Sequence, residues 1–584
     1  MKLSDYVIDS LEKQGVTHIF EVCGGALAHL LDSVYDKRDI TTVSMHHENA
    51  ASFAAEGYAR AGGNIGVAMA TSGPGATNLI TGIGSCYFDS IPCLFITGQV
   101  NTYEYKGEQA IRQIGFQETD IVSIVKPITK NARMVKDEKD IRYILGEAYT
   151  LARTGRPGPV LIDLPLNIQR ADIDVNALPA YADKPETLNY AELQGNINKI
   201  CDLIQTATRP VILMGGGVRA AHACEELYTF ATKTGIPIVS TLMGLDSFPH
   251  THKQYVGMIG TYGNRYANLT IANSDLIIAL GTRFDTRQTG TRPDTFARNA
   301  KIVHIDIDKL ELNAKLKVAV PVLADIRYFL HQINGHKLVN NSDWYCEWSQ
   351  KIEGYKKQYP DYLIPIKKAI DPNYLFHLLS KELADDAVIC VDVGQIQMWA
   401  AQSIELKKSQ RFLTEGGMAA IGSAVPMAIG AAFAKPNTQV IAVVGDGGFQ
   451  LNIQELQTIY HYQLPVKIIL LNNNGYGMIK QFQEQYMNSR FQSSGVGYSN
   501  PDFQKVVSAY KITAMKISEN SEIALILRQL LSDKEPGFLE VVIDPSARAT
   551  PKLSVNRPIE DQDPLLSREE LKKDMIIDIL PEPK

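Results

Sequence analysis

The chain has 584 residues and a formal net charge of −6, with 45% hydrophobic and 21% charged residues. This length predicts several domains, and the mild acidity disfavours nucleic-acid binding, which usually needs a basic surface. No apolar run approaches the ~20 residues that cross a bilayer. The seven cysteines are scattered without CxxC spacing, so we expect reduced thiols in a cytoplasmic protein with no membrane partner.

Short apolar runs alternate with helical patterns along the whole chain. After an amphipathic helix in residues 1–15, the predicted strands are "GVAMAT", "IPCLFITG", "PVILMGGG", "SDLIIALG", "KIVHIDID", "AVICVDVG", "QVIAVVGD" and "PVKIILLNNN". These runs are apolar on both faces, as parallel strands covered by helices must be. The pattern predicts an α/β protein with doubly wound parallel sheets.

Two polar, proline-bearing stretches, 176–189 and 333–362, suggest domain boundaries. They predict domains at 1–175, 190–335 and 365–550, followed by a tail at 551–584 with little β signal. The sequences of the first and third predicted domains both contain the order strand, glycine-rich turn, helix, turn, strand. This similarity suggests an active site built between paired domains, although all doubly wound domains share some of the pattern.

A buried strand, "VIAVV", ends in the turn "GDGG", and a helix and a second strand then lead to "NNNGYG". In a right-handed βαβ unit, Asp446 and Asn473 would meet at the carboxyl edge of one sheet, where α/β proteins bind ligands. Their oxygens, with the Gly475 carbonyl, are ligands that Mg²⁺ prefers. The glycines and the following helix start would favour a diphosphate. A GDG turn alone can be an ordinary strand-to-helix connection.

The spacing of 27 residues between Asp446 and Asn473 resembles the diphosphate-binding motif of thiamine diphosphate (ThDP) enzymes. Further stretches resemble the acetolactate synthase branch of that superfamily: "TSGPGATNLITGI", "GRPGPVLIDLP", "VGQIQMWAAQ" and "NNNGYGMIKQFQ". The resemblance extends to about residue 545. It implies a pyrimidine-binding first domain, a central Rossmann-like domain, a diphosphate-binding third domain, and a homodimer or homotetramer.

The resemblance also assigns roles to single residues. Glu48, in "MHHENAASFAAEGYARAGG", would bond the aminopyrimidine of ThDP and promote loss of the C2 proton, acting across a subunit boundary. Ile421 would bend the cofactor, and Ala419 would supply a carbonyl to its aminopyrimidine. Taken alone, Glu48 could be a surface residue at a helix start, and Ile421 could be ordinary core.

The full sets implied by the resemblance are as follows. The catalytic residues are Glu48, Gly24, Phe116 and Gln117. The ThDP contacts are Thr71, Pro74, Asn78, Gly394, Gln395, Gly417, Ala419, Ile421, Gly445, Asp446, Gly447, Gly448, Asn473, Tyr476, Gly477 and Met478. The Mg²⁺ ligands are Asp446, Asn473 and Gly475, and the substrate contacts are Arg287, Met478, Phe482 and Leu166.

Acetolactate synthases hold FAD, without net redox chemistry, in the middle domain. The matching residues here are Gly215, Gly216, Gly217, Thr241, Leu242, Met243, Gly263, Gly281, Arg283, Asp285, Arg287, Asp306, Ile307 and Asp325. The glycine-rich turn after "PVIL" can admit a pyrophosphate, and acidic strand ends can bind ribose hydroxyls. The alternative is a middle domain that binds no flavin.

The chain departs from the branch pattern around the substrate channel. Leu166 stands where the branch has Lys, Phe482 where it has Trp, Thr286 where it has Asp, and Ile396 where it has His, and "VCGG" replaces "YPGG". The donor half of the reaction should be intact because Glu48, Asp446 and Asn473 remain. The acceptor half stays open.

The function predicted is decarboxylation of a 2-oxo acid, pyruvate, followed by ligation of its acetyl unit to a second carbonyl. The acceptor is pyruvate, 2-oxobutyrate or a bulkier ketone such as a keto-sugar nucleotide, since the tail resembles those of proteins outside branched-chain amino-acid synthesis. Alternatives on the same scaffold are a non-ligating decarboxylase and a cyclic dione hydrolase. A non-catalytic paralogue would not need to keep Glu48, Asp446 and Asn473.

Overall fold

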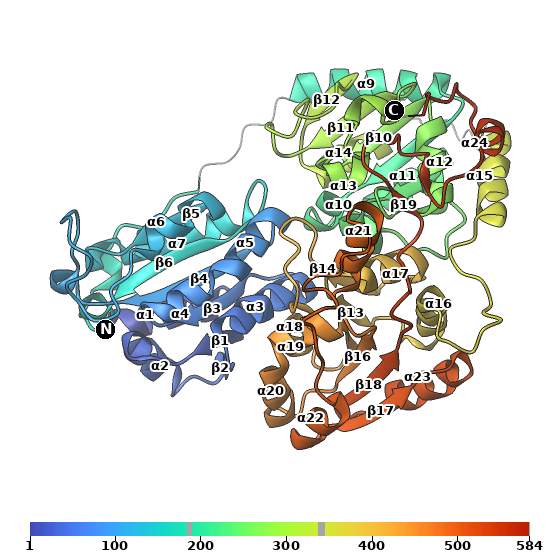
Figure 1. The fold of residues 1–584 in the computed structure, drawn as a ribbon. Coiled ribbons are helices and arrows are strands. Elements are labelled where there is room, and N and C mark those ends of the chain that lie inside the picture. The colour runs from blue at the N-terminus through green and yellow to red at the C-terminus, as the bar shows by residue number, and fades with distance from the viewer. Residues whose placement is uncertain (184–189, 337–344, 583–584) are drawn as a thin grey trace.

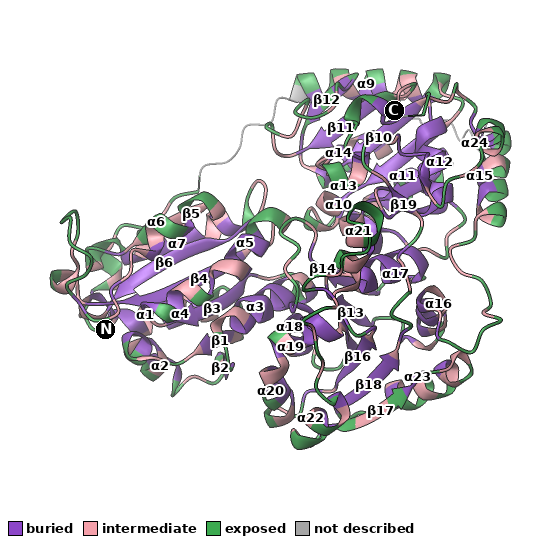
Figure 2. Ribbon diagram, in the orientation of Figure 1, coloured by how far each residue is buried: buried purple, intermediate pink, exposed green. Residues whose placement is uncertain are grey.

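The computed structural model describes residues 1–183, 190–336 and 345–582, and within them the chain forms three six-stranded parallel sheets with helices on both faces (Figure 1). Figure 2 shows that the central strands of the sheets are buried, while the outer helix faces and several edge strands are exposed or partly exposed. The predicted α/β class with three doubly wound sheets is therefore confirmed. None of the described helices combines the length and apolar composition that a bilayer crossing requires. All seven cysteines lie in the described part of the chain and are free thiols.

The first sheet has the strand order β2-β1-β3-β4-β6-β5. Its strands are β1 (His18–Val22), β2 (Thr41–Ser44), β3 (Gly66–Ala70), β4 (Cys93–Gln99), β5 (Asn131–Met134) and β6 (Val160–Pro165). The helices are α1 (Leu3–Lys13), α2 (Ala28–Val34), α3 (Glu48–Gly62), α4 (Pro74–Asn78), α5 (Ile80–Asp89), α6 (Ile121–Val125), α7 (Ile141–Arg153) and α8 (Leu166–Gln169). Strands β3, β4 and β6 are buried along their full length, which explains their unbroken apolar runs.

The middle sheet has the order β12-β11-β10-β7-β8-β9, the arrangement of a Rossmann fold. Its strands are β7 (Pro210–Met214), β8 (Ile238–Ser240), β9 (Tyr255–Met258), β10 (Leu276–Leu280), β11 (Lys301–Asp306) and β12 (Val320–Leu323). The helices are α9 (Tyr190–Thr206), α10 (Gly216–Ala220), α11 (Cys224–Thr234), α12 (Arg265–Asn273), α13 (Thr286–Thr289), α14 (Ile326–Asn334) and α15 (Cys346–Gln358).

The third sheet has the order β14-β13-β15-β16-β18-β17. Its strands are β13 (Val388–Val391), β14 (Arg411–Thr414), β15 (Val440–Gly445), β16 (Val466–Asn472), β17 (Thr513–Ile517) and β18 (Gly537–Val542). The helices are α16 (Pro372–Glu382), α17 (Gln395–Ser403), α18 (Ala424–Ala434), α19 (Asp446–Leu451), α20 (Leu456–His461), α21 (Gly477–Tyr486), α22 (Phe503–Ala509) and α23 (Ile523–Ser532). When the strands are numbered separately within each sheet, the first and third sheets have the same strand order, so the similarity predicted for the two domains is confirmed.

The tail folds back onto the middle domain. It forms a two-stranded antiparallel pair, β19 (Lys552–Leu553) with β20 (Gln562–Asp563), and a helix, α24 (Arg568–Asp574). The Leu553 N–H donates to the Thr261 carbonyl at 2.6 Å, and Gln562 Nε2 donates to the Gly263 carbonyl at 2.9 Å. The tail is thus held at one edge of the middle sheet.

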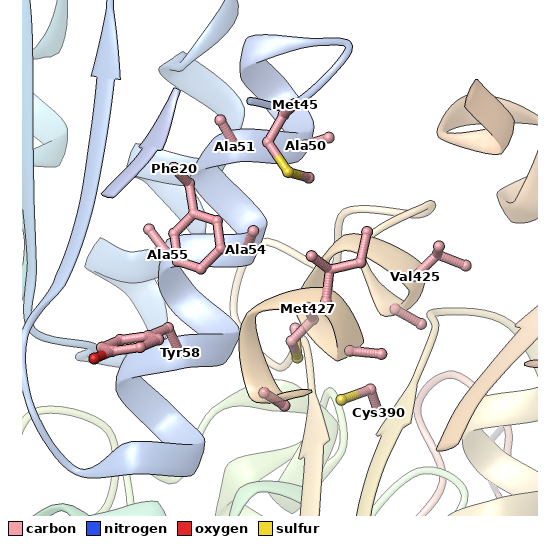
Figure 3. Packing of buried hydrophobic residues seen from close by; sticks show 14 of the residues in the cluster. Phe20, Met45, Ala50, Ala51, Ala54, Ala55, Tyr58, Cys390, Val425 and Met427 are labelled. Atoms are coloured by element: carbon pink, nitrogen blue, oxygen red, sulfur yellow. The ribbon is translucent and has the colours of Figure 1, made fainter. Parts of the chain in front are cut away.

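Helices α3 and α18 connect the first and third domains by packing backbone against backbone. Figure 3 shows Ala54 on the side of α3 that faces the turn of α18 carrying Met427, while the Tyr58 ring points to the other side of α3. Glycines make this possible: a Cβ on Gly57 would lie 2.1 Å from the Met427 carbonyl oxygen, and one on Gly430 would lie 1.8 Å from that of Ala54. Added side-chain atoms at either position would force the helices apart.

This packing predicts that Gly430→Ala destabilises the protein, although alanine is the better helix former. The displaced helices should lower the free energy of unfolding by about 1–3 kcal/mol. Gly354→Ala in α15 is the matched control because a Cβ there meets no atom within 4 Å, and it should stabilise slightly, by up to about 1 kcal/mol. Denaturant melts of both variants measure the difference. Equal effects at the two positions would contradict the close crossing.

Candidate active site

A cavity of about 410 Å³ lies between the middle and third domains. The third domain lines it with the ends of β13, β15 and β16 and the loop before α18. The middle domain contributes the loops after β8, β9 and β10. Of the residues predicted from the sequence, those that line this cavity are Thr241, Leu242, Met243, Arg283, Asp285, Arg287, Gly394, Gln395, Ala419, Ile421, Gly445, Asp446, Gly447, Gly448, Asn473, Gly475, Tyr476, Gly477 and Met478.

Asp446 stands at the point where β15 passes directly into α19. Strands β15 and β16 are parallel neighbours, so the carboxylate lies beside the loop that follows β16. Its Oδ2 accepts hydrogen bonds from the Gly475 N–H at 3.0 Å and from Asn500 Nδ2 at 2.7 Å. Burial raises the pKa of this carboxyl, and the Asn500 bond counteracts part of the rise. A bound cation would favour the ionised form and relieve that cost.

Asn473 and Gly475 complete the set of oxygen donors at this edge. Asn473 Nδ2 donates to Gln395 Oε1 at 3.1 Å, which uses the amide nitrogen and leaves the amide oxygen as the atom able to bind a cation. Gly475 has a φ of +157°, and a Cβ there would lie 2.6 Å from the Ser494 carbonyl oxygen. The loop therefore requires glycine at this position. These donors fit Mg²⁺, which takes carboxylate, amide and carbonyl oxygens.

The glycine turn after β15 also matches a coenzyme that approaches the backbone closely. A Cβ on Gly447 would lie 2.5 Å from the Tyr476 ring, and one on Gly448 would lie 2.0 Å from Asp392 Oδ2. The cavity volume is in the range of small-molecule and cofactor sites. The residues present therefore fit a diphosphate-bearing coenzyme anchored through a metal ion.

The loop that presents Ile421 is held by Asp392, a residue that the sequence reasoning missed. Asp392 follows β13 and accepts hydrogen bonds from the backbone N–H groups of Gly422 and Ser423, the former at 2.9 Å. Burial raises the pKa of Asp392 to about 7. Ala419 in the same loop has a φ of +58°, a conformation unusual for alanine that marks strained backbone at functional sites. The sequence signal that could have identified Asp392 is a predicted strand that ends in an acid, "VICVDVG".

The residues predicted from the first domain gather at a separate place, the carboxyl edge of the first sheet. Glu48 begins α3, and its Oε2 accepts from Asn78 Nδ2 at 2.9 Å. Gly24 packs on Thr71, where a Cβ would lie 2.4 Å from the Thr71 Cβ. These three elements meet because β1, β2 and β3 are neighbours in the sheet.

Four further first-domain residues lie around this Glu48 cluster. Gln117 touches Gly73, because a Cβ built on Gly73 would lie 3.0 Å from the Gln117 Cβ. Pro74 is the first residue of α4. Phe116, next to Gln117, is 86% exposed. Leu166 follows β6 at the same edge of the sheet.

Within one chain, the Glu48 cluster and the Asp446 cavity remain apart. Glu48, Gly24, Thr71, Pro74, Asn78, Phe116, Gln117 and Leu166 do not line the cavity that contains Asp446. Gly417 lies just outside it, with its N–H bonded to Asp89, and Phe482 lines an adjoining pocket. A single copy of the chain therefore presents two half-sites.

A second cavity of about 300 Å³ lies between the first and middle domains. Of the residues predicted to bind FAD, Gly216, Gly217, Thr241, Met243, Gly281, Arg283, Asp306, Ile307 and Asp325 line it. Leu242, Asp285 and Arg287 line the Asp446 cavity instead, and Gly215 and Gly263 line neither. Gly215 packs against the Gly281 carbonyl, where a Cβ would lie 2.1 Å away. Arg153, Arg156 and Arg283 add positive charge suited to a dinucleotide's phosphates.

A buried cluster of acids, which the sequence did not suggest, joins the first and third domains. Carboxylate oxygens of Glu56, Asp89 and Glu415 lie within 4.8 Å of one another. Asp89 accepts from the N–H groups of Gly416 and Gly417, and Arg60 pairs with Glu56 at 3.0 Å. Among the described residues, Glu415 forms no ion pair, and Arg60 acts on it only at longer range. Burial, reinforced by Glu56, raises the pKa of Glu415 well above its usual range.

Comparison with known proteins agrees with this geometry. Residues 1–124, 197–333 and 392–541 match the N-terminal TPP binding domain, the central domain and the C-terminal TPP binding domain of thiamine pyrophosphate enzymes. The chain belongs to the thiamine pyrophosphate enzyme family. Within this family it is an acetolactate synthase-like member, because it is 37% identical to the acetolactate synthase large subunit of Lactococcus lactis over 94% of both chains.

Two further relatives place the chain in the same branch of thiamine pyrophosphate enzymes. The probable acetolactate synthase large subunit of Methanocaldococcus jannaschii is 39% identical over 94% of this chain and 92% of its own. The acetolactate synthase large subunit of Corynebacterium glutamicum is 37% identical over 95% and 89%. The resemblance recognised from the motifs is therefore confirmed, and the chain is a ThDP-dependent enzyme.

Asp446→Asn should remove metal-dependent coenzyme binding. The change keeps the size of the side chain and removes the charge, so Mg²⁺-dependent affinity for ThDP should fall by about 100-fold. Calorimetric titration of ThDP with and without Mg²⁺ measures the loss. Asp533→Asn, at an exposed position of the same domain, is the control and should bind like the wild type. Unchanged metal dependence in Asp446→Asn would disprove the assignment.

The acid cluster predicts a pH dependence of stability. The pKa of Glu415 is raised in the folded state, so its contribution to stability is complete below about pH 4.5, the pKa of the unfolded chain. That contribution is lost as the pH rises through the folded pKa. Melting temperatures of the wild type should therefore fall more steeply as the pH rises above 4.5 than those of Glu415→Gln. Asp392, whose pKa is also raised, contributes equally to both proteins. Exposed Glu108→Gln is the control, and an identical slope in Glu415→Gln would refute the interpretation.

Proposed function

We propose that the enzyme decarboxylates pyruvate and ligates the resulting acetyl unit to the carbonyl carbon of a second substrate. The observation that carries this proposal is the pair of half-sites, Glu48 at one sheet edge and Asp446 with Asn473 at another. The resemblance assigns the first to coenzyme activation and the second to binding of Mg²⁺ and the diphosphate. The names of the relatives, acetolactate synthases, support pyruvate as the donor.

The coenzyme, when bound, supplies a nucleophilic carbon and takes up the electron pair released as the donor loses CO₂. The chain's own residues would bind and orient the coenzyme and hold the proton that its activation requires. Asp446 and Asn473, with the Gly475 carbonyl, would hold Mg²⁺ and through it the diphosphate. Ile421, which is 39% exposed and lines the cavity, would keep the coenzyme bent. Asp392 keeps that loop in place through the Gly422 and Ser423 N–H groups.

Glu48 would hold the proton needed for activation. Asn78 occupies Oε2, which leaves Oε1 for the aminopyrimidine ring. The neighbouring Gly75 keeps this oxygen accessible, since a Cβ there would lie 3.3 Å from Oε1. Because Glu48 does not line the Asp446 cavity of its own chain, the working site needs Glu48 from a second copy. A homodimer, or a tetramer built from such dimers, is the assembly this arrangement supports.

FAD is the group we assign to the second cavity, without a redox role. The strand-end glycines Gly216 and Gly217 leave space beside the start of α10, and Asp306 and Asp325 offer oxygens to ribose hydroxyls. Arg156 is paired with Asp308 and Glu311 at 3.0 Å, and Arg283 with Asp285 at 3.5 Å, so Arg153, which has no ion pair with the described carboxylates, is the better candidate for a phosphate contact. The acceptor of the acetyl unit would enter past Met478 and Phe482, with Arg287 binding its anionic group.

Glu48→Gln should slow exchange of the coenzyme's C2 proton by about 100-fold, because the glutamine cannot stabilise the reactive tautomer. Proton exchange followed by NMR measures this directly, and Glu108→Gln is the control. An exchange rate like that of the wild type would refute the role of Glu48.

The shared site can be tested by mixing two inactive variants. Co-refolded or co-expressed Glu48→Gln and Asp446→Asn chains should regain about a quarter of the wild-type activity, since half of the dimers are mixed and each mixed dimer has one intact site. Activity is read as CO₂ release from pyruvate with ThDP and Mg²⁺. Absence of recovery in mixtures shown to contain mixed dimers would mean that each site is built within one chain.

A further inference from the structure

A pocket of about 340 Å³ adjoins the Asp446 cavity where the tail crosses the middle domain. The two share Thr261, Tyr262, Arg287, Met478 and Ile479, so a molecule in one can extend into the other. Helix α21 provides Phe482 and Tyr486, and the tail provides Lys552. We call this space the mouth pocket.

Lys552 is a nearly buried cation in the mouth pocket. It is 7% exposed, and its Nζ donates to Gln485 Oε1 at 2.6 Å. It lies 5.4 Å from the ring centroid of Tyr486 and 6.0 Å from that of Phe482. Among the described residues, no carboxylate oxygen comes within the 4.0 Å of an ion pair. Burial without an ion-pair partner is costly for an ammonium group and favours an anionic ligand.

Arg287 supplies a second positive charge to the same pocket. Its guanidinium lies over the ring of Tyr262, 5.9 Å from the centroid, and it forms no ion pair with the described carboxylates. The nearby Asp285 is engaged by Arg283 at 3.5 Å. Two cations therefore share one pocket without close counter-charges.

The acid opposite Lys552 in the β19–β20 pair is already engaged by other side chains. Asp563, in β20, accepts hydrogen bonds from Ser554 Oγ and, at 3.2 Å, from Gln485 Nε2. It offsets part of the charge of Lys552 but does not pair with it. Gln485 thus holds the ammonium with its oxygen and the carboxylate with its nitrogen, which keeps the two apart.

We propose that the mouth pocket selects an acceptor carrying a phosphoryl group several bonds from its reactive carbonyl, with Lys552 and Arg287 binding the phosphoryl oxygens. The carboxylate of a small 2-oxo acid adjoins its carbonyl and would stay in the Asp446 cavity. A phosphoryl group on a longer skeleton reaches the mouth, and Phe482 and Tyr486 cover that skeleton. This inference rests on the proposed carboligation and specifies its acceptor.

The test compares paired acceptors that differ only in the phosphoryl group, dihydroxyacetone phosphate and dihydroxyacetone, with pyruvate as donor. The wild-type holoenzyme should have a KM at least tenfold lower for the phosphorylated acceptor. Lys552→Met should raise that KM at least tenfold with less than a threefold change in kcat. Lys552→Arg, which keeps the positive charge, should retain much of the wild-type preference for the phosphorylated acceptor. Inorganic phosphate should compete with the acceptor in the wild type and not in Lys552→Met.

Lys505→Met, at a surface position of α22, is the matched control and should behave like the wild type. Equal use of both acceptors, or an equal effect of Lys552→Met on both, would overturn the inference. A Lys552-dependent preference for 2-oxoglutarate over the phosphorylated acceptor would overturn the phosphoryl assignment. Release of CO₂ from pyruvate by the wild type is scored separately, so failure of the proposed function is distinguishable from failure of this inference.

Discussion

The close crossing of α3 and α18 is the contact on which the arrangement of the sites depends. Helix α3 begins at Glu48, and α18 follows the loop that carries Ile421, so this one contact relates the position of Glu48 to that of the Ile421 loop. Gly57 and Gly430 allow the backbones to touch, which leaves little freedom for the two domains to slide. Glu48 does not line the Asp446 cavity of its own chain, and under the proposed function it would act in the site of a second copy.

Both half-sites arise from the same local physics. In each outer sheet, parallel strands end at one edge, and the loops there place polar side chains next to one another. The shared strand order means that two versions of one domain present equivalent edges, one with Glu48 and the other with Asp446. A site made by opposing two such edges can enclose a bent coenzyme that neither edge would surround alone.

Much of this could be predicted from the sequence because the signals are local. Apolar runs ending in glycine and acid identify strand ends, and a right-handed crossover then brings Asp446 near Gly475. The Glu415 cluster could not be predicted because its acids come from three distant segments and meet only when the domains pack. Asp392 was missed for another reason: a single acid after a strand is common, and only its bonds to Gly422 and Ser423 reveal its role.

Under the proposed function, the tail would let the acceptor vary while the coenzyme site is kept. Lys552 belongs to a short hairpin anchored on Thr261 and Gly263, whereas the coenzyme is assigned to strand ends in other domains. A substitution at Lys552 or Phe482 alters the mouth without disturbing the sheet edges. Of the departures from the acetolactate synthase pattern, Phe482 and Thr286 line the mouth pocket, Ile396 lines the Asp446 cavity, and Leu166 lies at the edge of the first sheet.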